Sequence, residues 1–156
     1  MGPLASRRLF RWASIGHILV AVAHFNGQFL SRWVGPPPPA AEVELMKHMA
    51  SIGGEMLGLR FTVVGVMDGL GLFYSAFSLF AGIQNLLLLR LVAEEDPAPR
   101  SLAWANAALC GALGAIALAL GLAPPLLCYL VLLPLFALSG LGRPGEPAAP
   151  EAPGEA

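Results

Sequence analysis

Apolar residues run almost without interruption through four stretches of this chain. Every backbone polar group inside a bilayer must be satisfied within its own segment, so crossing a hydrocarbon core of about 30 Å takes about 20 largely apolar residues in a helix. Each stretch approaches or exceeds that length, and the pattern therefore predicts four transmembrane helices. They cover residues 9–30, 61–89, 102–122 and 125–141.

The connection between the first two spans changes pattern twice. The prolines at positions 36–39 predict an extended polyproline II segment, because proline lacks the N–H that a helix needs. From residue 40 to residue 59, apolar residues recur at alternating steps of four and three, which is typical of an amphipathic helix. Gly53 and Gly54 weaken the continuity of that helix. Its apolar stripe consists of Leu45, Met49, Ile52, Met56 and Leu59.

The chain ends in a segment without a hydrophobic pattern. Residues 143–156 are mostly proline, alanine, glycine and glutamate, a composition typical of disordered chain. We therefore expect a membrane domain over residues 1–142 and a disordered tail over residues 143–156. The predicted fold class is all-α: a bundle of four transmembrane helices, with the amphipathic helix of residues 40–59 lying on the membrane or capping the bundle.

The composition favours a membrane protein and excludes several other classes. Hydrophobic residues make up 56% of the 156 residues and charged residues only 12%, whereas an average soluble domain is about 25% charged. The formal net charge of −1 leaves no basic face for nucleic acid. The two cysteines have no C-x-x-C spacing, which excludes a disulfide scaffold and a zinc finger. No metal site is predicted.

The basic residues indicate an orientation, because loops rich in Lys and Arg stay in the cytoplasm. Six of them lie on the side of the two termini, and three lie in the long connection between the first two spans. The sequence therefore predicts that both termini are cytoplasmic. The first group is Arg7, Arg8, Arg11, Arg90, Arg100 and Arg143, and the second is Arg32, Lys47 and Arg60.

The N-terminal residues allow a second interpretation. Residues 6–11 resemble a twin-arginine export signal, and residues 21–23 resemble a cleavage site. The three further spans, and His17 inside the apolar region, favour a first helix that is retained.

Three ionisable residues fall at membrane depth, where such side chains are costly and are functional hypotheses by default. They are His17 and His24 in the first span and Asp68 in the second. The two histidines are seven residues apart, about 10 Å along a helix, so they do not readily share one ion. Asp68 falls in the same half of the membrane as His24, Asn26 and Gln28. A contact between His24 and Asp68 would either exchange protons or fasten two helices, and we favour fastening.

The outer connection adds polar residues to this region. His48 and Glu55 share one stripe of the predicted amphipathic helix, and Arg60 follows it. We expect them to close over the mouth between spans one and two and so to complete a polar pocket. The predicted binding or proton-relay residues are His17, His24, Asn26, Gln28, His48, Glu55, Arg60 and Asp68. A second polar set, Gln84, Asn85 and Asn106, is expected to cross-link helices.

Some of these residues belong to motifs in the first 90 residues. A Gly-His motif ending at His17 is followed by His24, residues 56–60 precede the second span, and an Asp-Gly-Leu-Gly motif begins at Asp68. Together they resemble a family of small uncharacterised bacterial four-helix integral membrane proteins, in which an aromatic is usual where Leu70 stands here. The resemblance implies a bacterial inner membrane. It supports His17, His24 and Asp68 as site residues and implies no known reaction.

These observations leave three function classes open. The favoured one is a membrane protein that binds a lipid, a quinone or another apolar small molecule between spans one and two. The alternatives are a small intramembrane enzyme with a His24 and Asp68 proton-transfer pair, and a structural subunit of a membrane complex. No hydrolase, nucleotide-binding or metalloprotease motif is present in the sequence. The cofactor is left open, since two suitably placed ligands suffice for haem, and small residues in the third span allow a homo-oligomer.

Overall fold

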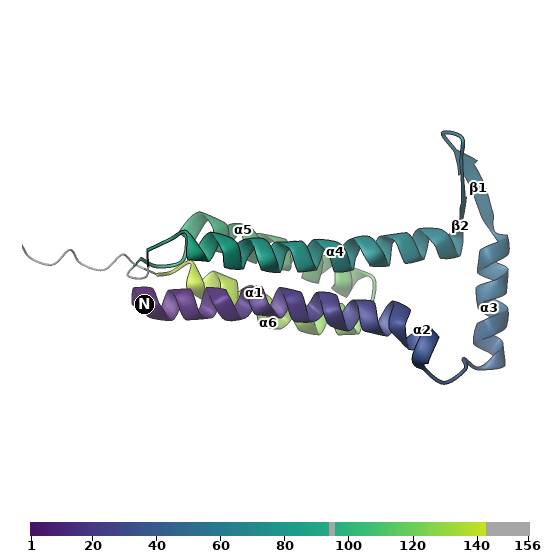
Figure 1. Cartoon of the computed structure of the whole chain (residues 1–156), viewed down its shortest axis with the longest axis horizontal. Coiled ribbons are helices and arrows are strands. Elements are labelled where there is room, and N and C mark those ends of the chain that lie inside the picture. The colour runs from purple at the N-terminus through teal and green to yellow at the C-terminus, as the bar shows by residue number, and fades with distance from the viewer. Residues whose placement is uncertain (94–95, 143–156) are drawn as a thin grey trace, which may run out of the picture. The chain divides into compact units, whose positions relative to one another are not determined.

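The fold is known from a computed structural model, which describes residues 1–93 and 96–142. The predicted tail over residues 143–156 therefore lies outside the described residues. The chain is mostly helical (Figure 1). It divides into two compact units. We call the first, Met1–Ser14 with Asn85–Ala156, the α5–α6 unit, and the second, Ile15–Gln84, the hairpin unit. Helices α1 (Pro3–Phe25) and α4 (Val63–Arg90) contribute to both units.

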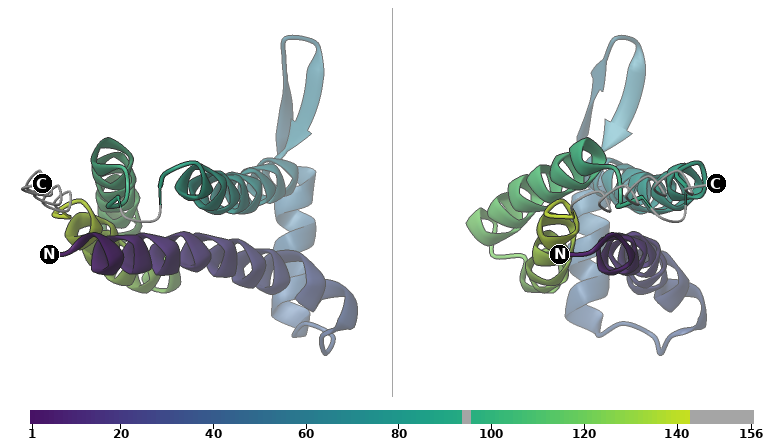
Figure 2. Two further views of the ribbon diagram at one scale, coloured as in Figure 1. Left: turned by 60° about the vertical axis from the view of Figure 1, so that its left-hand side comes forward. Right: turned by 90° about the vertical axis from the view of Figure 1, so that its left-hand side faces the viewer.

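The α5–α6 unit is built on a helical hairpin. Helices α5 (Arg100–Ala119) and α6 (Ala123–Ser139) lie side by side in both views of Figure 2. The turn between them has Gly121 at a φ of +66°, and the N–H of Leu122 donates to the carbonyl of Ala117 at 2.8 Å. This is a Schellman ending, which needs a left-handed residue that glycine adopts without steric cost.

Small residues and aromatic rings fill the core of the α5–α6 unit. Ala103, Ala107 and Cys110 on one side of α5 are buried, and such small side chains allow helices to approach closely. Phe10 and Phe136 are both fully buried, and their rings meet edge to face with centroids 5.5 Å apart. This pair joins the first turns of α1 to the last turns of α6.

The hairpin unit contains the connection that the sequence predicts to be amphipathic. Helix α1 continues into a π-helix, η1 (Asn26–Leu30), and a short helix, α2 (Ser31–Val34). Pro39, at the end of the proline run, has φ −56° and ψ 148°, which are polyproline II angles. Helix α3 (Ala40–Ser51) follows and lies across the end of α4 rather than along it (Figure 1).

The predicted amphipathic helix over residues 40–59 is correct only as far as Ser51. Beyond it the chain forms a two-stranded antiparallel sheet, β1 (Gly53–Met56) and β2 (Leu59–Thr62). The predicted all-α class is confirmed for this mostly helical chain, apart from this small sheet. At Gly53 a Cβ would overlap the carbonyl oxygen of Phe61, so only glycine fits. Leu57 and Gly58 both have positive φ, 55° and 78°, which makes a two-residue hairpin turn of type I′. Two glycine positions therefore override the helical periodicity.

The number of helices able to cross a membrane also differs from the prediction. Among the described residues two helices, α4 and α5, are long and apolar enough to do so. Helix α6 is apolar but has 17 residues. Helix α1 has 23 residues, but three arginines and two histidines lower its hydropathy. Of the four predicted transmembrane helices, two are therefore long and apolar enough to cross a membrane.

Candidate functional site

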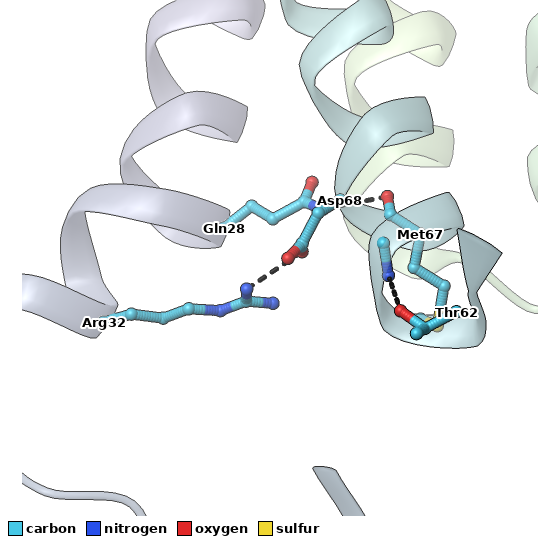
Figure 3. A network of polar contacts seen from close by, with 6 residues as sticks. Gln28, Arg32, Thr62, Met67 and Asp68 are labelled. Atoms are coloured by element: carbon cyan, nitrogen blue, oxygen red, sulfur yellow. Dashed lines mark hydrogen bonds and ion pairs between the residues drawn. The ribbon is translucent and has the colours of Figure 1, made fainter. Parts of the chain in front are cut away.

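Most of the predicted site residues lie in the hairpin unit, where the end of α1, η1 and α2 run beside α4. Three side chains spaced four residues apart reach α4 from this segment: His24, Gln28 and Arg32. We call these three contacts the polar ladder. Figure 3 shows two of its steps, Gln28 and Arg32, with Asp68 and Met67 of α4 opposite them.

The first step of the ladder joins His24 to Ser75. The His24 Nδ1 atom lies 2.9 Å from Ser75 Oγ, and Ser75 Oγ donates to the carbonyl of Gly71 at 3.1 Å. A hydroxyl has one hydrogen, so with that hydrogen on Gly71 the Nδ1–H of His24 donates to Ser75. The ring of Tyr74 meets the His24 ring edge on, with centroids 4.7 Å apart. These contacts fix the plane of the imidazole.

The second step depends on a glycine. Gln28 Nε2 donates to the carbonyl of Met67 at 3.3 Å, and the Gln28 amide occupies the space that a Cβ on Gly71 would need. Gly71 thus lets the Gln28 side chain lie directly on the α4 backbone. This contact gives a structural role to the last glycine of the Asp-Gly-Leu-Gly motif, because the Gln28 side chain packs against it.

The third step is an ion pair. Arg32 Nη1 lies 2.9 Å from Asp68 Oδ1, and the two side chains are 44% and 32% exposed (Figure 3). At that exposure an ion pair contributes no more than about 1 kcal/mol. Asp68 therefore pairs with Arg32, and His24 with Ser75. The contact between His24 and Asp68 that the sequence allows is not among the hydrogen bonds and ion pairs of the described residues.

The π-helix keeps the three ladder residues on one side. In an α-helix, residues four apart drift around the axis by about 40° per step, because a turn takes 3.6 residues. The i→i+5 bonding of η1 widens the turn over Asn26–Leu30 and offsets that drift. Irregular turns of this kind are frequent at functional sites. Residues 24, 28 and 32 can therefore all reach α4.

An apolar groove lies in the same unit and shares Ser75 with the ladder. Its volume is about 570 Å³, within the range of small-molecule sites. Val22 and Phe25 line it from α1, Leu72 and Leu79 from α4, and polar atoms come only from Ser75 and Asn26. The remaining lining residues are Ala21, Leu30 and Ala76. The groove lies between the segments predicted as spans one and two, and most of its lining is apolar.

The other predicted site residues do not join the ladder. Glu55 and Arg60 face each other across the sheet register, 4.0 Å apart, with side chains 61% and 92% exposed. His48 is exposed on α3. They do not form the roof that the sequence predicts, because the amphipathic helix on which that prediction rests ends at Ser51. His17 is buried within α1, seven residues before His24.

The α5–α6 unit contains the second predicted polar set and one contact that the sequence did not suggest. Asn85 and Asn106 exchange two side-chain hydrogen bonds, of 2.9 and 3.2 Å, which confirms the predicted amide cross-link between helices. Arg7, predicted only as a charge flanking the first span, is buried and donates to carbonyls at the end of α4 and just beyond it. Its shortest bond, 2.6 Å, reaches the carbonyl of Ala93.

No cluster of three His, Cys, Asp or Glu residues suited to an ion occurs within residues 1–93 and 96–142. Comparison of the chain with protein-family models, with curated proteins and with solved structures found no match.

Proposed function

We propose that this protein is an integral membrane protein that binds a lipid, a quinone or a similar apolar molecule in the groove between α1 and α4. The observation that carries the proposal is the groove itself, which opens at the surface and combines about 570 Å³ of volume with apolar walls and two polar side chains. Ligand sites typically have this combination, since the apolar walls supply affinity and a few polar atoms fix orientation. The neighbouring ladder, with His24 bonded to Ser75, supports one wall of the groove.

The membrane location is supported by the surfaces of the helices. In the most apolar parts of α4 and α5 only 28% of the residues are buried, whereas a core helix of a soluble protein would be mostly buried. Large apolar side chains such as Phe73, 69% exposed, and Leu118, 67% exposed, would face water in a soluble protein. A lipid environment removes that cost.

We extend this proposal to four spans. Helix α6, with 17 residues, would be about 26 Å long, at the lower limit for crossing a bilayer. Helix α1 exposes Trp12 and Leu19, each more than 60%. With α1 and α6 spanning, the basic residues favour cytoplasmic termini in a bacterial inner membrane. Retention in the membrane after alkaline carbonate washing, and cytoplasmic activity of a reporter fused to the C-terminus, are the expected results.

Native mass spectrometry of the protein purified in mild detergent tests the binding function. We expect a stoichiometric lipid or quinone on the wild-type chain. Ala76→Trp should remove it, because Ala76 is an exposed lining residue whose enlargement fills the groove. Ala108→Trp, at an exposed alanine of α5, is the matched control and should retain the ligand. A wild-type protein that stays empty when natural membrane lipids and quinones are added would overturn the proposal.

A further inference from the structure

A second cavity in the hairpin unit has a different chemical character from the groove. It has a volume of about 730 Å³ and lies between the proline run, one side of α3 and the start of α4. Two cations, Arg32 and Lys47, and one carboxylate, Glu42, line it together with apolar atoms from Val43, Met46 and Val64. Lys47 also pairs with Glu44, with 4.0 Å between Nζ and Oε2. The guanidinium of Arg32 beside an apolar wall suits an anionic group attached to an apolar body.

Arg32 retains hydrogen-bonding capacity toward this cavity. Its ion pair with Asp68 is made by a single atom, Nη1, whereas a guanidinium carries five N–H donors in a planar fork. The side chain is 44% exposed and also lines the cavity. A carboxylate or phosphate arriving there can accept two parallel bonds from such a fork, which is the strongest arrangement available to arginine.

The cavity and the groove follow each other along the same helices. On the α1 side, Leu30 lines the groove and Arg32, two residues later, lines the cavity. On α4, Val64 lines the cavity and Leu72 begins the groove, a separation of about 12 Å along the helix axis. A charged pocket therefore precedes an apolar groove in the order in which a lipid headgroup precedes its chain.

We propose that the two cavities hold one ligand, an anionic single-chain lipid whose headgroup binds Arg32 and whose chain lies in the groove. This inference rests on the proposed binding function and specifies its ligand class and polarity. Arg32 carries the recognition, because Lys47 is paired with Glu44 and Glu42 adds a negative charge to the lining. The carboxylate of Asp68 competes with the ligand headgroup for the guanidinium of Arg32.

Titration of the full-length protein, in an uncharged detergent, with oleate and with oleyl alcohol separates headgroup recognition from chain binding. The two probes share one hydrocarbon chain and differ in charge. We expect oleate to bind the wild-type protein at least tenfold more tightly than the alcohol. Arg32→Gln should bring the affinity for oleate down to that for the alcohol and leave the affinity for the alcohol unchanged.

Asp68→Asn provides the decisive contrast. This substitution removes the carboxylate that competes with the headgroup and should raise the affinity for oleate severalfold. If the ion pair only holds the structure together, Asp68→Asn and Arg32→Gln should both lower the affinity for oleate. Arg8→Gln, at an exposed arginine of the other unit, is the control and should change nothing.

The outcomes distinguish this inference from the proposed function. Equal affinities for oleate and oleyl alcohol in the wild-type protein would overturn the headgroup assignment and leave the binding function intact. A loss of oleate affinity in Asp68→Asn as large as in Arg32→Gln would also overturn it. If neither oleate nor oleyl alcohol binds, the headgroup assignment is wrong and the groove does not bind long-chain lipids.

Discussion

The two units of this protein differ in the exposure of the cation that links their helices, although each also contains buried polar side chains. In the α5–α6 unit the polar groups are enclosed: Ser6 and Ser139 are fully buried, Ser6 donates to the carbonyl of Ser139 at 2.7 Å, and Arg7 bonds a set of carbonyls. In the hairpin unit the polar ladder ends in a partly exposed ion pair beside a groove and a charged cavity. Enclosed polar groups fix one structure, whereas partly exposed groups next to a cavity remain available to a ligand.

The two units also contribute differently to stability and to function. A buried polar group costs most when its partner is removed, so substitutions in the α5–α6 unit should mainly change the free energy of unfolding. Exposed pairs contribute little to stability, so substitutions in the ladder should mainly change binding. The following substitutions test this division.

The largest expected effect is at Arg7. Arg7→Met removes a cation that bonds the carbonyls of Leu89, Val92 and Ala93. Leaving such groups unpaired should lower the free energy of unfolding by about 3 kcal/mol. Unfolding in mixed detergent followed by circular dichroism measures it. The neighbouring exposed Arg8, changed to Met, is the control, and an equal loss there would refute the role of Arg7.

A smaller effect is expected at the amide pair. Asn106→Leu leaves the Asn85 amide without its partner and should destabilise by about 1 kcal/mol, the size typical of interhelical hydrogen bonds in membranes. The double variant Asn85→Leu/Asn106→Leu should recover part of that loss, because neither amide is then left unpaired. The same unfolding assay measures both. A double variant as unstable as the sum of the singles would contradict the pairing.

At the turn between β1 and β2 we expect a substitution to raise the local stability of the hairpin by a similar amount. Leu57 adopts a φ of 55°, a conformation that costs a residue with a Cβ about 1 kcal/mol or more. Leu57→Gly should therefore slow hydrogen exchange of the amides of β1 and β2 severalfold. Unchanged exchange would show that the turn does not limit the stability of the hairpin.

A substitution at Gly71 should change stability least, but it should move the Gln28 side chain. Gly71→Ala gains up to about 1 kcal/mol of helix propensity but displaces the end of the Gln28 side chain. We expect the two effects to nearly cancel in the free energy of unfolding. Nuclear magnetic resonance of the side-chain amides should show a shifted Gln28 signal, and an unshifted one would contradict the contact.

The sequence predicted the helices well where long apolar stretches mark them. The predicted second and third spans, residues 61–89 and 102–122, correspond to α4 and α5 within three residues at each end. The prediction was wrong over residues 52–59, because a 3.6-residue pattern continues through a segment whose conformation is decided by single glycines. Gly53 accepts the close approach of Phe61, and Gly58 completes the turn. Such local requirements do not alter the hydrophobic period.

The candidate site was predicted in part. The sequence predicts that His24, Gln28 and Asp68 fall in the same half of the membrane, since the first two spans run in opposite directions. It did not assign Arg32 to Asp68, because Arg32 was attributed to the outer connection, which the π-helix and α2 in fact extend into helix. The spacing of four between residues 24, 28 and 32 is the signal that suggests the ladder. The groove has no comparable signal, because its lining consists of ordinary apolar residues.

Photocrosslinking from the groove distinguishes a ligand site from an ordinary lipid-facing surface. A diazirine amino acid is placed at Ala76, inside the groove, or at Ala108, on the exposed surface of α5, and the protein is irradiated in native membranes. Mass spectrometry of the adducts then identifies what lies next to each position. The groove account predicts one dominant lipid or quinone adduct at Ala76 and a mixture reflecting bulk membrane lipids at Ala108. Indistinguishable adducts at the two positions would contradict it.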